Sequence, residues 1–120
     1  MLIAAKDSLL LIDPKKDQFR VSNPHQPQFL ALEVEFELSN DHLLPLIPEA
    51  LSKMLGLEEL ELRTMAINGK KEKMPFVGPV RFDFMGRTHF SGGLIYGNHL
   101  VIGDRVLQGM GLAIHKDSAP

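Results

Sequence analysis

The residues best suited to chemistry lie in one short polar run, Ser39-Asn40-Asp41-His42, between two apolar segments. Asp41 offers a carboxylate and His42 an imidazole, two groups that could exchange protons or bind a metal ion weakly. A structural interpretation competes with this one, because Asn and Asp at a turn commonly hydrogen-bond to their own backbone. The residue types therefore favour a turn and leave acid–base and metal chemistry as alternatives.

Other chemical motifs are sparse. Ser91-Gly92-Gly93 lacks the lysine and the helix start that a phosphate-binding loop needs, so these glycines instead predict a bulge or a close approach of two backbones. We expect no metal site and no cofactor. The remaining histidines show no ligand spacing such as a pair four residues apart on a helix, and they are His25, His89, His99 and His115.

The bulk properties describe one small domain of 120 residues with a formal net charge of -2. A near-neutral charge argues against nucleic acid and against an anionic membrane surface as partners, since both favour a basic face. The chain has no cysteine, which excludes disulfides and thiolate chemistry. Lys6 and Asp7 interrupt the apolar start, so we predict no signal peptide and a cytoplasmic location.

Short apolar segments punctuated by proline and glycine predict a mostly β fold with one or two short helices. Pro48 and Gly56 bound a predicted helix, and Asn68-Gly69 predicts the tight turn of a hairpin. A second hairpin is expected around Gly86, and a short helix after Gly103. The predicted strands include residues 8–13 and 18–22 (paired as a hairpin), 29–38 (with Leu30 to Leu38 alternating inward), 43–47, 59–67, 70–78, 79–84, 88–95, 100–102 and one starting at Leu112.

Two stretches of the chain together resemble the retropepsin-like aspartic proteases. The segment "LVIGDRVLQGMGLAI" is similar to their C-terminal part, with Ile102 and Gly103 leading into a helix over 104–108. The segment "LIPEALSKMLGLEELELRTMAINGKKEKMPFVGPV" is similar to the middle of the small bacterial single-lobe members, through its "IPE", "LGL" and "VGPV" motifs. The hairpin at Asn68 and Gly69 would then be the flap that closes over substrate.

This resemblance implies a small closed β-barrel of the retropepsin-like (acid protease) type with one or two short helices. It implies one domain over residues 1–120, with a retropepsin-like core at 29–117 and an N-terminal hairpin extension and linker at 1–28. Family members often finish with a strand-turn-strand that this chain lacks after Leu112. We expect the N-terminal hairpin to replace that tail beside the Leu112 strand.

The family's catalytic signature, Asp-Thr/Ser-Gly, is replaced in this chain. Its position, counted back from Ile47-Pro48-Glu49, falls on Ser39 for the aspartate, Asn40 for the hydroxyl residue and Asp41 for the glycine. Family members use one aspartate from each protomer of a two-fold dimer, and the two carboxylates share a proton across the axis. A serine cannot share a proton in this way, so the degenerate signature predicts loss of peptidase activity.

The resemblance therefore favours an inactive aspartic protease homologue, a pseudoenzyme that acts as a homodimeric peptide-binding or scaffold protein. An extended peptide or protein segment would pair beneath the flap. One alternative is an active aspartic-type endopeptidase with a displaced carboxylate dyad formed by Asp41 of each protomer. A second alternative is an unrelated small β-barrel binding module.

Overall fold

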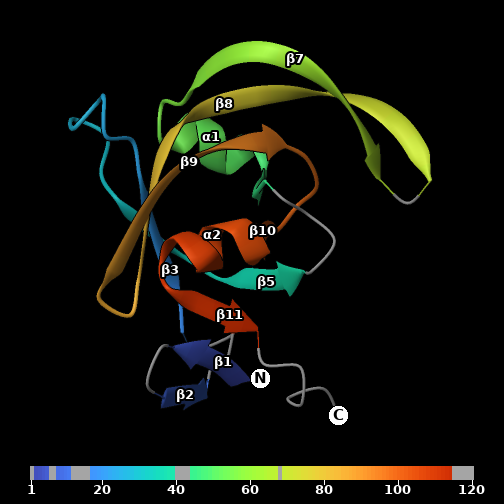
Figure 1. Ribbon diagram of the computed structural model, residues 1–120. Helices are drawn as coiled ribbons and strands as arrows, with labels where there is room; N and C mark the ends of the chain where they lie inside the picture. The colour runs from blue at the N-terminus through green and yellow to red at the C-terminus, as the bar shows by residue number, and fades with distance from the viewer. Residues whose placement is uncertain (1, 6–7, 12–16, 40–43, 68, 115–120) are drawn as a thin grey trace.

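The computed structural model describes residues 2–5, 8–11, 17–39, 44–67 and 69–114. These residues form two sheets and two short helices (Figure 1). The mostly β prediction is therefore confirmed. The elements in chain order are β1 (Leu2–Ala5), β2 (Ser8–Leu11), β3 (Phe19–Ser22), β4 (Leu32–Val34), β5 (Phe36–Ser39), β6 (Leu46–Ile47), α1 (Glu49–Met54), β7 (Glu58–Ile67), β8 (Lys70–Phe84), β9 (Arg87–Ile95), β10 (Leu100–Gly103), α2 (Asp104–Gly109) and β11 (Leu112–Ile114).

The larger sheet has eight strands of mixed direction. Its strand order is β4-β3-β8-β9-β6-β10-β5, and β7 pairs with β8 beside this path. The prediction of a closed barrel is not met, because the hydrogen-bonded path is open between β4 and β5. These two end strands follow one another in the chain and are separated only by Glu35. They are therefore connected by the covalent chain and not by a ladder of hydrogen bonds.

The segment from Leu32 to Ser39 follows the predicted alternation. Phe36 is buried and Leu38 is half-buried, while Glu33 and Glu37 are exposed. This pattern confirms the prediction that the acidic stripe faces solvent and the apolar stripe faces the core. Leu30 was predicted to share the apolar stripe, but it is 80% exposed because it precedes the first strand of the segment.

A cluster of four phenylalanine rings forms the centre of the core. The Phe19 ring stacks on Phe84 with centroids 4.3 Å apart and meets Phe36 edge-on at 4.6 Å. Phe82 completes the group at 6.3 Å from Phe19. Edge-on and stacked arrangements are those that aromatic pairs prefer. The cluster joins β3, β5 and β8, and buried residues of α2 pack on the same core.

The N-terminal hairpin differs from the predicted one. The structure pairs β1 with β2, in register Ala5↔Ser8, rather than residues 8–13 with 18–22. The strand at 18–22, β3, pairs with β4 and β8 in the larger sheet. No strand is predicted before Lys6, but the structure has one there, β1. β1 also pairs with β11, the strand that starts at Leu112, so an N-terminal strand does lie beside it.

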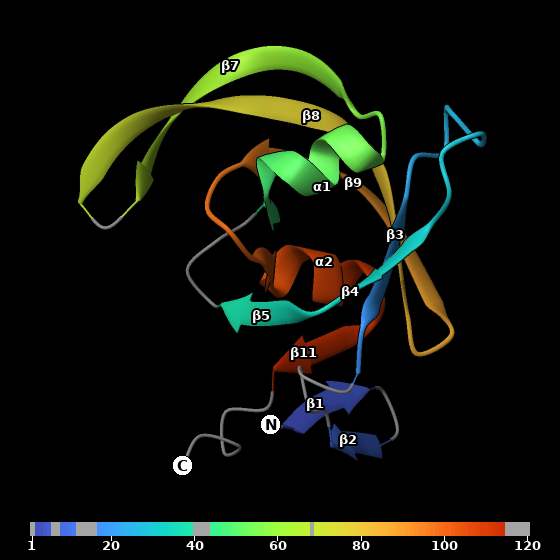
Figure 2. The ribbon, with the colours of Figure 1, turned by 180° about the vertical axis from the view of Figure 1, so that it is seen from behind.

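The β7–β8 hairpin arches away from the rest of the sheet (Figures 1 and 2). Its register pairs Ile67 with Lys70, which agrees with the two-residue turn predicted at Asn68-Gly69. Gly69 has a φ of 77°, whereas Asn68 lies outside the described residues. The second predicted hairpin also forms: Met85 and Gly86 both have positive φ, as a primed turn requires. Strand β8 is continuous from Lys70 to Phe84 rather than two strands.

The glycines at 92 and 93 allow close contacts, as predicted. A Cβ added to Gly92 would lie 2.2 Å from the Phe76 ring, and one on Gly93 would lie 2.4 Å from the Ile47 side chain. The ladder between β8 and β9 is irregular opposite them, between Val77 and Val80. Within the described ranges, neither helix is long and apolar enough to cross a membrane.

Candidate functional site

The candidate site is the end of β5, where the degenerate signature begins. Strand β5 runs parallel to β10, and the register places Ser39 opposite Gly103 and Leu38 opposite Ile102. Strand β6 lies on the other side of β10, with Leu46 opposite Val101. The chain therefore leaves β5 at Ser39 and returns on the far side of β10. The structure thus brings Ser39, which the resemblance placed in the degenerate signature, beside Ile102 and Gly103, which it placed in the C-terminal segment.

Local sequence explains why β10 ends at this site. Ile102 is fully buried, and Gly103 is the extended residue that caps α2 at its N-terminus. Helix α2 then buries Val106 and Leu107 and packs against β9, β10 and β11 (Figure 2). This packing fixes the end of β10, and through the parallel ladder it fixes the position of Ser39.

Ser39 is the one signature residue that the structure describes, and its side chain is a hydroxyl rather than a carboxylate. Ser39 is half-buried and takes part in an interaction within the fold. An alcohol does not ionise in the range where a carboxyl pair shares a proton, so it cannot replace one member of an aspartic dyad. Asn40, Asp41 and His42 lie outside the described residues, so the displaced-dyad alternative stays a prediction.

The β7–β8 hairpin contributes an apolar face beside this site. Ile67 and Met74 on the hairpin are buried together with Leu46 of β6 and Leu94 of β9. The underside of the predicted flap therefore packs on β6, which lies beside β10, and on β9, which lies beside β6. The residues packed around this second cluster are Leu44, Met65, Phe76, Tyr96 and Val101. The guanidinium of Arg63 lies over the Phe76 ring, 3.7 Å from its centroid.

No protein-family model matches this sequence, and no curated protein matches it significantly. The retropepsin-like resemblance therefore rests on the quoted motifs alone.

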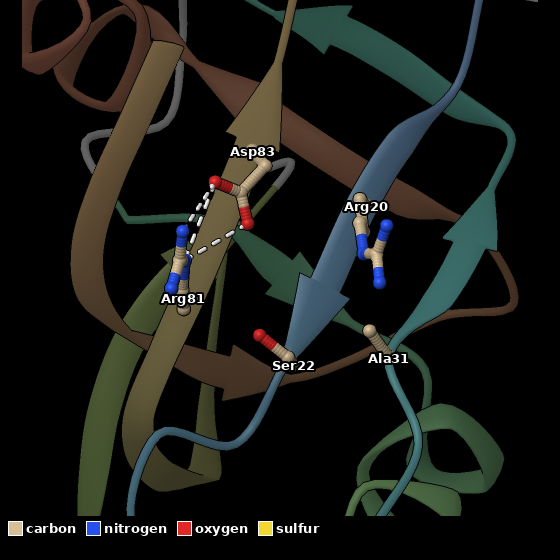
Figure 3. A pocket seen from close by; sticks show the side chains of 5 residues that line it. All are labelled: Arg20, Ser22, Ala31, Arg81 and Asp83. Carbon is tan, nitrogen blue, oxygen red and sulfur yellow. Dashed lines mark hydrogen bonds and ion pairs between the residues drawn. The ribbon is translucent and has the colours of Figure 1, made fainter. Parts of the chain in front are cut away.

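Two features of the described structure were missed by sequence reasoning. The buried Asn23 amide donates to the carbonyl oxygens of Leu55 and Gly56, at 3.1 and 3.0 Å, and so ties the β3 loop to the end of α1. Nothing local in the sequence indicates this contact. The second is a polar hollow on the outer sheet face, where Arg81 and Asp83 alternate with Phe82 and Phe84 (Figure 3). That alternation was visible in "PVRFDF" and could have been recognised.

The described histidines do not gather with acidic residues into a group of three that could hold a metal ion. His89 has a structural position instead. Its ring lies against α2, where a Cβ on Gly109 would be only 2.1 Å from its Nδ1. Burial, together with the nearby charge of Arg105, lowers the pKa of His89 below its usual 6.5.

This lowered pKa predicts a loss of stability in mild acid. The folded state disfavours the charged imidazole, so the neutral His89 side chain contributes to the free energy of unfolding. This contribution is fully present above the pKa of the unfolded state and declines as the pH falls below about 6.5. We expect the urea midpoint to fall between pH 7.5 and pH 5.5, and His89→Gln to flatten this dependence. The exposed His99 provides the control, because His99→Gln should keep the wild-type slope. Equal slopes for wild type and His89→Gln would contradict the prediction.

Proposed function

We propose that this chain is a retropepsin-like protein that has lost peptidase chemistry and acts as a homodimeric peptide-binding or scaffold protein. The observation that carries the proposal is the position of Ser39. It ends β5 beside Gly103, at the point where the resemblance puts the catalytic aspartate. The frame is kept and the acidic group is replaced.

Loss of the carboxylate affects both halves of a symmetric dimer. A two-fold axis brings the same residue from each protomer to the centre, so two serines replace two aspartates. The shared proton that activates water is then absent at that position. The retained function would be binding, since positioning a peptide does not require an acid–base pair.

The hairpin supports a peptide as the ligand. On the side away from β8, no other described strand pairs with β7, and an edge strand of this kind accepts an added extended segment. Beneath it, the apolar side chains of Met65 and Phe76 are only half-buried and could contact a bound side chain. The proposed ligand is therefore an extended segment with apolar side chains.

A cleavage assay tests the loss of activity. We expect the wild-type chain to cleave no member of a broad peptide library between pH 3.5 and pH 6, and Asp41→Ala to leave this result unchanged. An active peptidase with a dyad of two Asp41 residues predicts the opposite. Cleavage by the wild type that Asp41→Ala abolishes would overturn the proposal and establish that alternative.

A further inference from the structure

A hollow of about 350 Å³ lies on the outer face of the larger sheet, on the side opposite the phenylalanine core. Its lining comes from three neighbouring segments: Arg20 and Ser22 of β3, Ala31 before β4, and Arg81 and Asp83 of β8 (Figure 3). Alternation along β3 and β8 explains the arrangement, because Val21 and Phe82 point into the core while their neighbours point outward.

Asp83, the one carboxylate among the described residues of this lining, forms an ion pair with Arg81. Arg81 donates from Nε to Asp83 Oδ2 at 3.0 Å and from Nη2 to Oδ1 at 3.2 Å. The hydroxyl of Thr88 also donates to Oδ1 of Asp83, at 2.5 Å. The Asp83 carboxylate is thus turned along its own strand toward Arg81 (Figure 3). These contacts hold the Arg81 guanidinium in place, and its Nη1 group makes no hydrogen bond to another described residue.

Arg20 retains its positive charge without a counter-ion among the described residues. Its cross-strand neighbours are Asp83 on one side and Glu33 on the other. No ion pair joins Arg20 to either of them within the described structure. Its guanidinium therefore presents five N–H donors beside the Ser22 hydroxyl. The small side chain of Ala31 leaves the space between them open.

We propose that this hollow binds the oxyanion group of a small ligand, a phosphate or a carboxylate. Arg20 would supply the main charge and a bidentate pair of donors, the geometry in which guanidinium recognises oxyanions. Ser22 would add a hydroxyl donor, and Arg81 would add its remaining N–H group at the opposite wall. The hollow is within the size range of small-molecule sites. This site does not depend on the function proposed for the Ser39 region.

The test is a titration of the full chain with inorganic phosphate, and separately with acetate, followed by two-dimensional NMR at constant ionic strength. Constant ionic strength separates binding from general screening. We expect saturating shifts at the amides of Arg20, Ser22 and Arg81 with at least one of the two anions. The anion that binds more tightly identifies the ligand class. Shifts that spread over many basic residues without saturation, for both anions, would overturn the proposal.

Three variants make the assignment specific. Arg20→Gln should weaken binding about tenfold or more, because it removes a charged hydrogen-bond donor. Ala31→Leu should weaken it by a similar factor without any change of charge, because the larger side chain fills the hollow. Arg105→Gln removes the same charge from the exposed face of α2 and should leave the affinity within about twofold. Equal losses in Arg20→Gln and Arg105→Gln would show a non-specific charge effect and overturn the site.

Discussion

Restoring the signature, by Ser39→Asp, Asn40→Thr and Asp41→Gly in one chain, is expected to create an acid peptidase. The position of Ser39 beside Gly103 is set by the β5–β10 ladder, which the substitutions leave intact. In the proposed homodimer an aspartate there would meet its two-fold copy, and the pair would share a proton. Positioned acid–base catalysis contributes about 10²–10⁴-fold. We therefore expect cleavage at least about a hundredfold above the parent chain in the library assay.

The control keeps the same turn without the acid. The chain with Ser39→Asn, Asn40→Thr and Asp41→Gly should stay inactive, because an amide cannot exchange the proton. Two further readouts test the dimer. Activity per chain should rise with protein concentration, since each protomer supplies one carboxylate. The rate should also pass through a maximum with pH, because one carboxyl of the pair must be protonated and the other ionised.

Two outcomes would contradict the proposal. If the restored chain retains the parent's NMR spectrum and sediments as a dimer but cleaves no peptide, the end of β5 is not a catalytic position, and this result would argue against the retropepsin-like frame. A restored chain that sediments as a monomer at high micromolar concentration would instead contradict the homodimer.

Phe19→Ala is expected to have the largest effect on stability. The Phe19 side chain is fully buried and contacts three other rings, those of Phe36, Phe82 and Phe84. Removing it leaves a cavity between β3, β5 and β8 that the surrounding rings can fill only in part. Substitutions of this kind cost about 3–5 kcal/mol. This is a large share of the roughly 5–15 kcal/mol that stabilises a typical domain.

Phe90→Ala is the matched control for this measurement. Phe90 also lies on a strand of the larger sheet, but it is 56% exposed on the outer face. Its loss should change the free energy of unfolding by less than about 1 kcal/mol. Urea titrations of both variants measure the difference directly. Similar losses of unfolding free energy in the two variants would mean that the phenylalanine cluster is not the main stabilising part of the core.

Local chemistry was enough to predict several elements. The turns that contain Gly69 and Gly86 follow from glycines, which accept positive φ as a property of the single residue rather than of a fold. The exposed glutamates of residues 33–37 and the helix between Pro48 and Gly56 follow from periodicity and from end signals. The pairing of Ser39 with Gly103, by contrast, follows from no local rule.

Pairing between distant segments was decided by the tertiary structure. β1 lies between β2 and β11, and β4 and β5 bound an open path. The polar hollow depends on the same choice. Arg20 and Asp83 are 63 positions apart, and only the β3–β8 register places them opposite one another.

The sequence by itself determined the β-rich class, the two tight turns and the absence of an aspartate at position 39. These are properties of single residues or of short periodic runs, so they can be read without a fold. The tertiary structure decided which strands pair, where the sheet ends, and that Arg20 stands without a counter-ion among the described residues. The physical reason is that long-range pairing depends on how the whole set of apolar faces packs, and many pairings satisfy the local patterns equally well.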